Sequence, residues 1–255
     1  MKVTLILHWL TRFAALTLAL LSPVLTQASV VINSTRIIYP QQDKEVTIRL
    51  ESKNQAPVLL QVWLDDGDEH STPDVGAMPF VVTPPIFRIE PGKQHVVRMA
   101  YTGETLPSTQ ESLYWFNLLE VPAQAPSAEQ ANQLQLAFRT RIKVFFRPPD
   151  LPYPVEAAPA KLQWRSLVTE RGPTLEVYNP TPYYLNFDQI EVVAQGQRHA
   201  REPAASSADN MVAPHSRNQF QLPGLKSLPA SKMTVEFQSL DDFGLTTSHS
   251  AKVSS

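Results

Sequence analysis

The stretch from Asn132 to Pro152 reads NQLQLAFRTRIKVFFRPPDLP, and its first fifteen residues alternate in character. A period of two residues is typical of a β-strand, because successive side chains point to opposite faces. At roughly 3.3 Å per residue the run spans about 45 Å, whereas ordinary strands span about 17–20 Å. One face carries Leu134, Leu136, Phe138, Thr140, Ile142, Val144 and Phe146. The strand therefore offers more apolar face than one small domain can cover.

The amino-terminal part of this run has the character of an unprotected sheet edge. Leu134, Leu136 and Phe138 alternate with only Gln135 and Ala137 between them, and edge strands normally carry charge or proline against unwanted pairing. One interpretation is that all three side chains line the protein's own core. The length of the run favours the other, β-augmentation, in which another chain adds a strand at this edge.

The carboxyl-terminal part of the run is basic, with Arg139, Arg141, Lys143 and Arg147. The residues alone indicate a solvated face for these side chains. Lys143 lies nine residues beyond Leu134, which is about 30 Å along an extended strand. We therefore expect Lys143 to lie near a domain junction.

Short β-patterned runs fill the rest of the chain. Seven of them precede Asp150 at the spacing of sandwich domains, which predicts an immunoglobulin-like β-sandwich over residues 29–150. The proline-rich segment PPDLPYPVEAAPAK (148–161) follows and suits a stiff spacer. Further runs such as YYLNFDQIEVVA (183–194) predict a second, smaller β-sandwich over residues 151–255. We expect an all-β protein of two domains.

Residues 1–28 have the features of a secretory signal peptide. Lys2 and Arg12 form a basic region, an apolar run covers Phe13 to Leu25, and small residues precede a cleavage site after Ala28. Thirteen apolar residues are too few to span a bilayer, so we expect export without membrane insertion. The remaining chain carries a net charge of −4 and no cysteine. This favours a periplasm-like compartment and gives no reason to expect nucleic acid as a partner.

Motifs of enzyme active sites are missing from the sequence. It contains no Gly-x-Ser-x-Gly, no His-Glu-x-x-His, no phosphate-binding glycine loop and no cysteine. The acidic stretch LDDGDEH (64–70) lacks the order of a calcium loop, and we interpret it as a solvated turn after a strand. We expect no catalytic activity, no metal and no cofactor.

Five motifs in order carry a resemblance to a known family. They are STRIIYP (34–40), TPPIFRIEPG (83–92), ESLYWFNLLEVP (111–122), QLQLAFRTRIKVFFRP (133–148) and YNPTPYYLNF (178–187). With these motifs the chain resembles the PapD-like periplasmic chaperones of the chaperone–usher pathway. The resemblance implies two immunoglobulin-like domains in a boomerang arrangement with a cleft between them. It also implies an ATP-independent chaperone that binds fimbrial or pilus subunits and delivers them to an outer-membrane usher.

The resemblance further implies roles for individual residues. Arg36 and Lys143 match the pair that binds the carboxy-terminal carboxylate of a subunit, a task suited to charge-assisted hydrogen bonds. Leu134, Leu136 and Phe138 match the side chains that fill the groove of an incomplete subunit, which is donor-strand complementation. The last strand of the subunit should then run parallel to the long strand.

Two structural features are implied in the same way. Glu111, Arg147 and Asp242 match an interdomain charge network, and Thr83–Pro84 matches a cis peptide bond. The segment PAQAPSAEQAN (122–132) is closer to the short-loop group of the family, which is associated with rod-like pili. The competing hypothesis is a two-domain adhesin or carbohydrate-binding module. It requires an exposed aromatic platform, whereas Trp63, Trp115 and Trp164 lie in strand patterns that favour burial.

Overall fold

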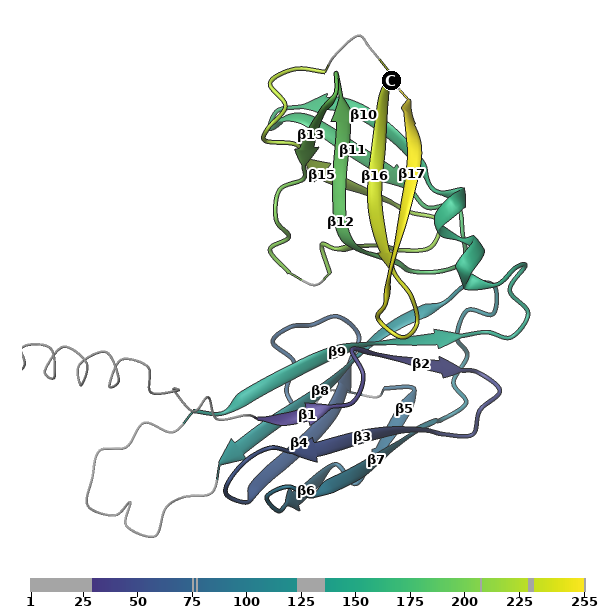
Figure 1. Cartoon of the computed structure of the whole chain (residues 1–255). Helices are drawn as coiled ribbons and strands as arrows, with labels where there is room; N and C mark the ends of the chain where they lie inside the picture. The colour runs from purple at the N-terminus through teal and green to yellow at the C-terminus, as the bar shows by residue number, and fades with distance from the viewer. Residues whose placement is uncertain are drawn as a thin grey trace, which may run out of the picture.

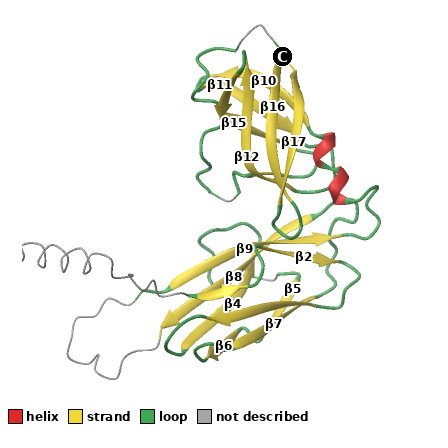
Figure 2. Ribbon diagram, in the orientation of Figure 1, coloured by secondary structure: helices red, strands yellow, loops and turns green. Residues whose placement is uncertain are grey.

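The computed structural model of the chain describes residues 29–74, 76, 78–122, 136–206, 208–228 and 232–254. They form two β-domains that meet at an angle (Figure 1), with short 3₁₀ turns at the junction (Figure 2). The predicted signal peptide and Leu134 lie outside the described residues. Within the described part, no helix is long and apolar enough to cross a membrane.

The first domain is a sandwich of two sheets. One sheet has the order β1-β3-β7-β5, and the other has the order β2-β9-β8-β4-β6. The strands are β1 (Val30–Ile32), β2 (Arg36–Pro40), β3 (Val46–Ser52), β4 (Val58–Asp65), β5 (Phe80–Thr83), β6 (Ile86–Ile89), β7 (Gln94–Tyr101), β8 (Ser112–Pro122) and β9 (Phe138–Arg147). Alternating apolar residues from both inner faces, among them Leu50, Leu60, Met99, Phe116 and Phe146, form one buried core.

The first segment of the domain crosses from one sheet to the other. β1 pairs with β3, whereas β2 pairs in parallel with the second half of β9, from Arg36↔Lys143 to Pro40↔Arg147. All of β9 except its last residue, from Phe138 to Phe146, also pairs with β8. Within the described part of the chain, residues 138–142 therefore pair on one side only. β9 is an interior strand in its second half and an edge strand in its first half.

Burial along β9 follows this division. Ile142, Val144 and Phe146 are buried in the core, whereas Phe138 is 55% exposed. Leu136, just before the strand, is also 55% exposed. Half of the alternating apolar face thus belongs to the protein's own core, and the other half extends past it.

The second domain is built from one continuous sheet that folds into a sandwich. Its order is β13-β12-β16-β17-β10-β11-β15, with β14 paired to β12. The bounds are η2 (Val155–Ala157), η3 (Pro159–Lys161), β10 (Gln163–Thr169), β11 (Gly172–Tyr178), β12 (Leu185–Ala194), β13 (Gln197–Ala200), β14 (Met211–Val212), β15 (Arg217–Gln221), β16 (Met233–Leu240) and β17 (Thr246–Ser254). Trp164, Phe187 and Phe237 pack together in its separate core. The all-β architecture with two immunoglobulin-like sandwiches is confirmed.

The hairpin between β16 and β17 brings the second domain onto the first (Figure 1). Its tip contains Gly244, whose φ of +83° favours glycine. Thr35 lies just before β2, and a Cβ atom at position 244 would be only 2.4 Å from its hydroxyl oxygen. Glycine therefore allows the hairpin to approach the start of β2 closely.

Candidate functional site

Two cations lie side by side at the domain junction. Arg36 begins β2 and Lys143 lies directly opposite it on β9, because the two strands pair in parallel register. Both side chains reach the second domain: Arg36 Nη1 donates to the Leu240 carbonyl at 3.4 Å, and Lys143 Nζ donates to Asn186 Oδ1 at 2.5 Å. Strand pairing thus brings together two residues that are far apart in the sequence.

The surroundings of the two cations disfavour their charge. Burial, together with the smaller effect of the neighbouring Arg36 charge, lowers the pKa of Lys143 to about 8. Burial also lowers the pKa of Arg36, against the opposing effect of Asp242 and Asp241. Arg36 Nε is buried and has no hydrogen-bond partner among the described residues. A carboxylate would supply both an acceptor and a compensating charge.

A pocket of about 210 Å³ opens beside the pair and is lined by both cations. Trp115, Asn186, Asp188 and Leu240 contribute to its walls. This volume is ample for a carboxylate and the waters around it, since one water needs only about 10–15 Å³ of the same kind of space. The pocket fits a small anionic group.

The residues expected to enter a subunit are exposed where they are described. Leu136 lies just before β9 and Phe138 begins it, and neither belongs to the buried core that contains Ile142 and Val144. Lys143 lies farther along the same strand. One strand therefore carries an exposed apolar residue at its start and a partly buried cation farther along.

The three residues of the expected interdomain network lie in contact. Arg147, at the end of β9, donates from Nε to Glu111 Oε1 at 2.7 Å, and from Nη1 and Nη2 to the two oxygens of Asp242 at 2.6 and 2.8 Å. The second oxygen of Glu111 accepts from the Tyr184 amide at 2.8 Å. Burial opposes the charge of Arg147, but the hydrogen bonds and charges of Asp242 and Glu111 raise its pKa. The network links β9 to two segments of the second domain.

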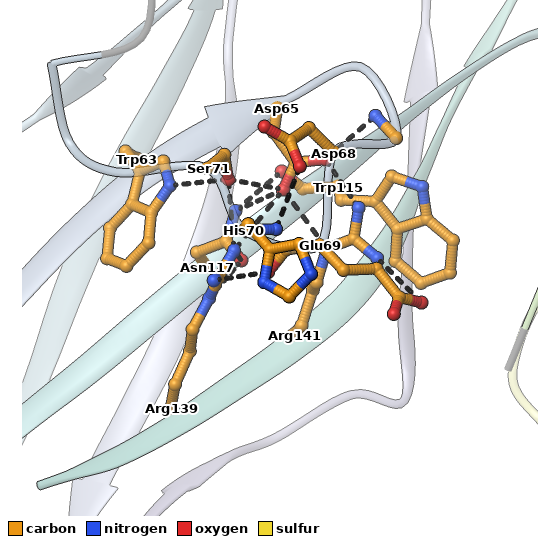
Figure 3. Close-up of polar contacts among 11 residues, drawn as sticks. Trp63, Asp65, Asp68, Glu69, His70, Ser71, Trp115, Asn117, Arg139 and Arg141 are labelled. Carbon is orange, nitrogen blue, oxygen red and sulfur yellow. Dashed lines mark hydrogen bonds and ion pairs between the residues drawn. The ribbon is translucent and has the colours of Figure 1, made fainter. Parts of the chain in front are cut away.

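The acidic stretch at the end of β4 meets the expectation of a solvated turn only in part, because residues 66–70 are exposed and follow the strand, whereas Asp65 is the last residue of β4. Asp65 is fully buried and accepts hydrogen bonds from Arg141 Nε at 3.0 Å and Asn117 Nδ2 at 2.8 Å. Arg139 donates to Asn117 Oδ1 at 3.0 and 2.8 Å. The alternation had indicated that Arg139 and Arg141 are solvated. Instead, both side chains bind partners on the outer face of the sheet (Figure 3). We name Asp65, Asn117, Arg139 and Arg141 the Asp65 cluster.

Two family models together match nearly all of the described chain. The model described as "Pili and flagellar-assembly chaperone, PapD N-terminal domain" matches residues 29–152, and "Pili assembly chaperone PapD, C-terminal domain" matches residues 157–251. The chain belongs to the PapD family of pilus-assembly chaperones. The predicted family is confirmed.

Named relatives of this chaperone agree with the family models. The probable fimbrial chaperone YadV of Escherichia coli K12 is 40% identical over 220 residues, covering 85% of this chain and 87% of the relative. The crystal structure of the YadV chaperone has a TM-score of 0.74 at 38% identity, covering 88% of this chain and all of the other. The SafB chaperone in complex with the SafA pilin, from Salmonella enterica, has a TM-score of 0.69 at 27% identity over 89% and 96% of the two chains.

Three further observations complete the description of this chaperone. The Thr83–Pro84 peptide bond is cis, the isomer implied by the resemblance. Trp63, Trp115 and Trp164 are buried, as their strand patterns predicted, so they form no exposed platform of the kind an adhesin requires. Among the described residues, no three His, Cys, Asp or Glu side chains are grouped to hold a metal ion.

Sequence reasoning missed two members of the site region. Asn186 follows Leu185 in an apolar run and gives no sign that its side chain meets Lys143. Asp65 was assigned to a turn because acidic residues follow it. The spacing of Asp65 from Trp63 could have identified it. Residues two apart in a strand share a face, so Asp65 lies beside a tryptophan on the outer face of β4, and this face is not simply solvated.

Proposed function

We propose that this chaperone holds unassembled pilus subunits in the periplasm, where a signal peptide at residues 1–28 would direct it. Arg36 and Lys143 bind the carboxy-terminal carboxylate of the subunit. The apolar side chains of Leu134, Leu136 and Phe138 fill the groove of the incomplete subunit sandwich. The subunit strand that pairs with β9 runs parallel to it, because its carboxyl end must lie at Lys143. The loaded chaperone delivers the subunit to an outer-membrane usher.

The observation that carries this proposal is the geometry of β9. Exposed apolar side chains at Leu136 and Phe138, an open edge at residues 138–142 and the partly buried Lys143 follow one another along β9 and the residues just before it. The second cation, Arg36, lies opposite Lys143 on β2. An extended peptide on that edge would place its side chains against the apolar segment and its terminus near the pocket at Lys143. The pilin complex of the related SafB chaperone supports a subunit as the partner.

Lys143→Met tests the carboxylate site. Methionine keeps most of the side-chain length but removes the charge, so we expect subunit binding to weaken by at least about 100-fold, since truncating a buried charge contact costs 2–5 kcal/mol. The free energy of unfolding of the free protein should rise by about 1–3 kcal/mol. The reason is that the variant no longer buries the charge whose unfavourable surroundings lower the pKa of Lys143 from 10.5 to about 8.

The measurements are a thermal melt and co-purification of subunits from periplasmic extracts. Arg98→Ala serves as the control, because this arginine is largely exposed on β7. Its binding and melting temperature should match those of the wild type. Wild-type levels of subunit in the Lys143→Met variant would show that the carboxylate is not bound here.

Binding should also depend on pH in the range where Lys143 titrates. A bound carboxylate favours the protonated ammonium, whose pKa is about 8 in the free chaperone. The affinity is expected to be constant below about pH 7 and to fall by up to about tenfold per pH unit above about pH 8. Titration calorimetry with a purified subunit between about pH 6 and pH 9.5 measures this slope.

Lys143→Arg provides the control for this titration, since guanidinium stays charged throughout the range. If this variant binds subunits, its affinity should not change with pH. A wild-type affinity that is equally flat would exclude a titrating Lys143 from the binding site.

A further inference from the structure

The first half of β9 has few of the contacts that normally hold a strand in place. Residues 138–142 pair with β8 on one side, and β2 begins only opposite Lys143. Leu136 and Phe138 are exposed on the face where a buried strand would pack on a core. A segment with one open edge and one uncovered face tends to open locally. Besides the pairing with β8, its order in the free protein depends on the remaining face.

That remaining face carries the Asp65 cluster. Arg139 and Arg141 alternate with Phe138 and Thr140, so they point away from the exposed apolar side chains. Their guanidinium groups stack on two buried tryptophans: Arg139 lies 4.9 Å from the ring centroid of Trp63, and Arg141 lies 4.0 Å from that of Trp115. Each arginine thus lies over a tryptophan on the outer face of β4 and β8, close to the other members of the Asp65 cluster (Figure 3).

Hydrogen bonds fix the two arginines in these positions. Arg141 contacts both oxygens of Asp65 through Nε and Nη2, which is the bidentate arrangement. Arg139 binds Asn117 Oδ1 twice, and Asn117 itself donates to Asp65. Asp65 lies at the end of β4 and Asn117 in the middle of β8. The cluster therefore connects three neighbouring strands through one buried carboxylate.

The loop after β4 closes over the cluster. The Gly67 amide donates to Asp65 Oδ1 at 2.8 Å, and the Ser71 hydroxyl donates to Asp65 Oδ2 at 3.2 Å. Arg139 reaches the same loop, with Nη2 donating to Ser71 Oγ at 3.0 Å and Nη1 to the Glu69 carbonyl at 2.7 Å. The acidic loop is thereby folded onto the arginines and excludes water from Asp65.

We propose that Asp65 and Asn117 are positioning residues for subunit binding. Through Arg139 and Arg141 they hold residues 138–142 in an extended conformation before a subunit arrives, so that the open edge is ready for strand pairing. This inference rests on the proposed function, because it concerns how the same strand receives its partner. A strand that is already ordered loses little conformational freedom on binding, which increases affinity.

Asp65→Asn tests the proposal with little change of shape. The amide cannot neutralise the two guanidinium groups beside it, so their mutual repulsion should loosen the first half of β9. Hydrogen exchange of the amides of residues 138–142 that pair with β8 should accelerate by about tenfold or more in the free protein. Binding of a subunit co-expressed from the native gene neighbourhood should weaken by about ten- to 100-fold, mainly through slower association.

Glu176→Gln is the matched control. Glu176 is a buried carboxylate of the second domain that binds Arg165 at 2.6 Å and Arg217 at 2.8 Å, on a sheet that does not contain β9. Glu176→Gln should lower the melting temperature about as much as Asp65→Asn does. Hydrogen exchange at residues 138–142 and the rate of subunit association should stay within about twofold of the wild type. If Asp65→Asn fails to fold, Arg139→Gln takes its place, because Arg139 is the more exposed of the two arginines.

The outcomes separate this proposal from the proposed function. The proposal is supported if Asp65→Asn, but not Glu176→Gln, shows faster hydrogen exchange confined to residues 138–142 together with slower subunit association. The proposal is overturned if exchange rises evenly over the first domain, if association is unchanged, or if Glu176→Gln impairs association equally. If the wild type holds no subunit at all, the proposed function fails, whereas the exchange measurement still shows whether the Asp65 cluster orders the strand.

Discussion

Replacing Arg147 with alanine should lower the free energy of unfolding by about 3–5 kcal/mol, the usual cost of removing one partner of a buried ion pair. The variant leaves Glu111, whose side chain is 1% exposed, without the one cation that pairs with it among the described residues. It also releases Asp242 and therefore the hairpin between β16 and β17. The two domains should lose their fixed orientation at the same time.

The pH dependence of this variant gives a second expected result. Without Arg147, burial raises the pKa of Glu111 further above its ordinary value, since burial already acts in that direction. A carboxyl group with a raised folded-state pKa stabilises the protein at low pH and loses that contribution as pH rises through this pKa. The deficit of the variant should therefore shrink as the pH falls from about 8 towards about 5. Urea titrations across this range measure it.

Arg198→Ala provides the matched control for Arg147→Ala. Arg198 also binds two carboxylates, Glu191 at 2.9 Å and Glu236 at 2.6 Å, but all three side chains are substantially exposed. Surface ion pairs contribute little to stability because water screens them. The control should melt close to the wild type. If Arg147→Ala and Arg198→Ala lowered the free energy of unfolding equally, the network at the junction would contribute no more to stability than a surface ion pair.

The structure changes the expected ranking of the arginines on β9. Alternation alone indicated that Arg139, Arg141 and Arg147 are all solvated, and the resemblance to the family singled out Arg147 as the one that is costly to remove. Arg141→Ala would leave the fully buried Asp65 short of its closest cationic partner, by the same reasoning that applies to Glu111. Burial alone would raise the pKa of Asp65, but hydrogen bonds from Arg141, Asn117 and Gly67 hold it below its ordinary value.

The sequence was sufficient for the fold because strand periodicity is a local property. The alternation of Ile142, Val144 and Phe146 identifies the half of β9 that packs on the core, and proline and turn residues mark the ends of most strands. The Arg36–Lys143 pair was different. Its residues come from strands that adjoin only through parallel pairing, so they could be named only by resemblance to a family.

The Asp65 cluster could not be predicted for a related physical reason. A pattern of polar residues on one strand face shows that the face is not part of the core, but it does not show whether those side chains meet water or buried partners. Arg139 and Arg141 find Trp63, Trp115 and Asn117 on two other strands. Such matches depend on register between segments distant in sequence, which no local pattern contains.

Leu136→Glu should abolish subunit binding while leaving the chaperone folded. Leu136 is 55% exposed at the start of the open edge, so a carboxylate at this position remains in water in the free protein. In the complex the same carboxylate would enter an apolar groove without a partner. This costs several kcal/mol, in addition to about 1.5–3 kcal/mol of lost burial for a leucine side chain. The affinity should fall by at least about 100-fold, since every 1.4 kcal/mol is a factor of ten.

Ile86→Glu is the control that gives this prediction its force. Ile86 is 53% exposed on β6, at the opposite edge of the same five-stranded sheet, so it matches Leu136 in exposure and in the change of charge. Circular dichroism and thermal melts should show both variants folded, and only Leu136→Glu should fail to retain a subunit on co-purification. If both variants retain subunits, the apolar segment before β9 does not enter the subunit. If Leu136→Glu unfolds while Ile86→Glu does not, Leu136 supports the chaperone's own fold, and donor-strand complementation by this residue is wrong.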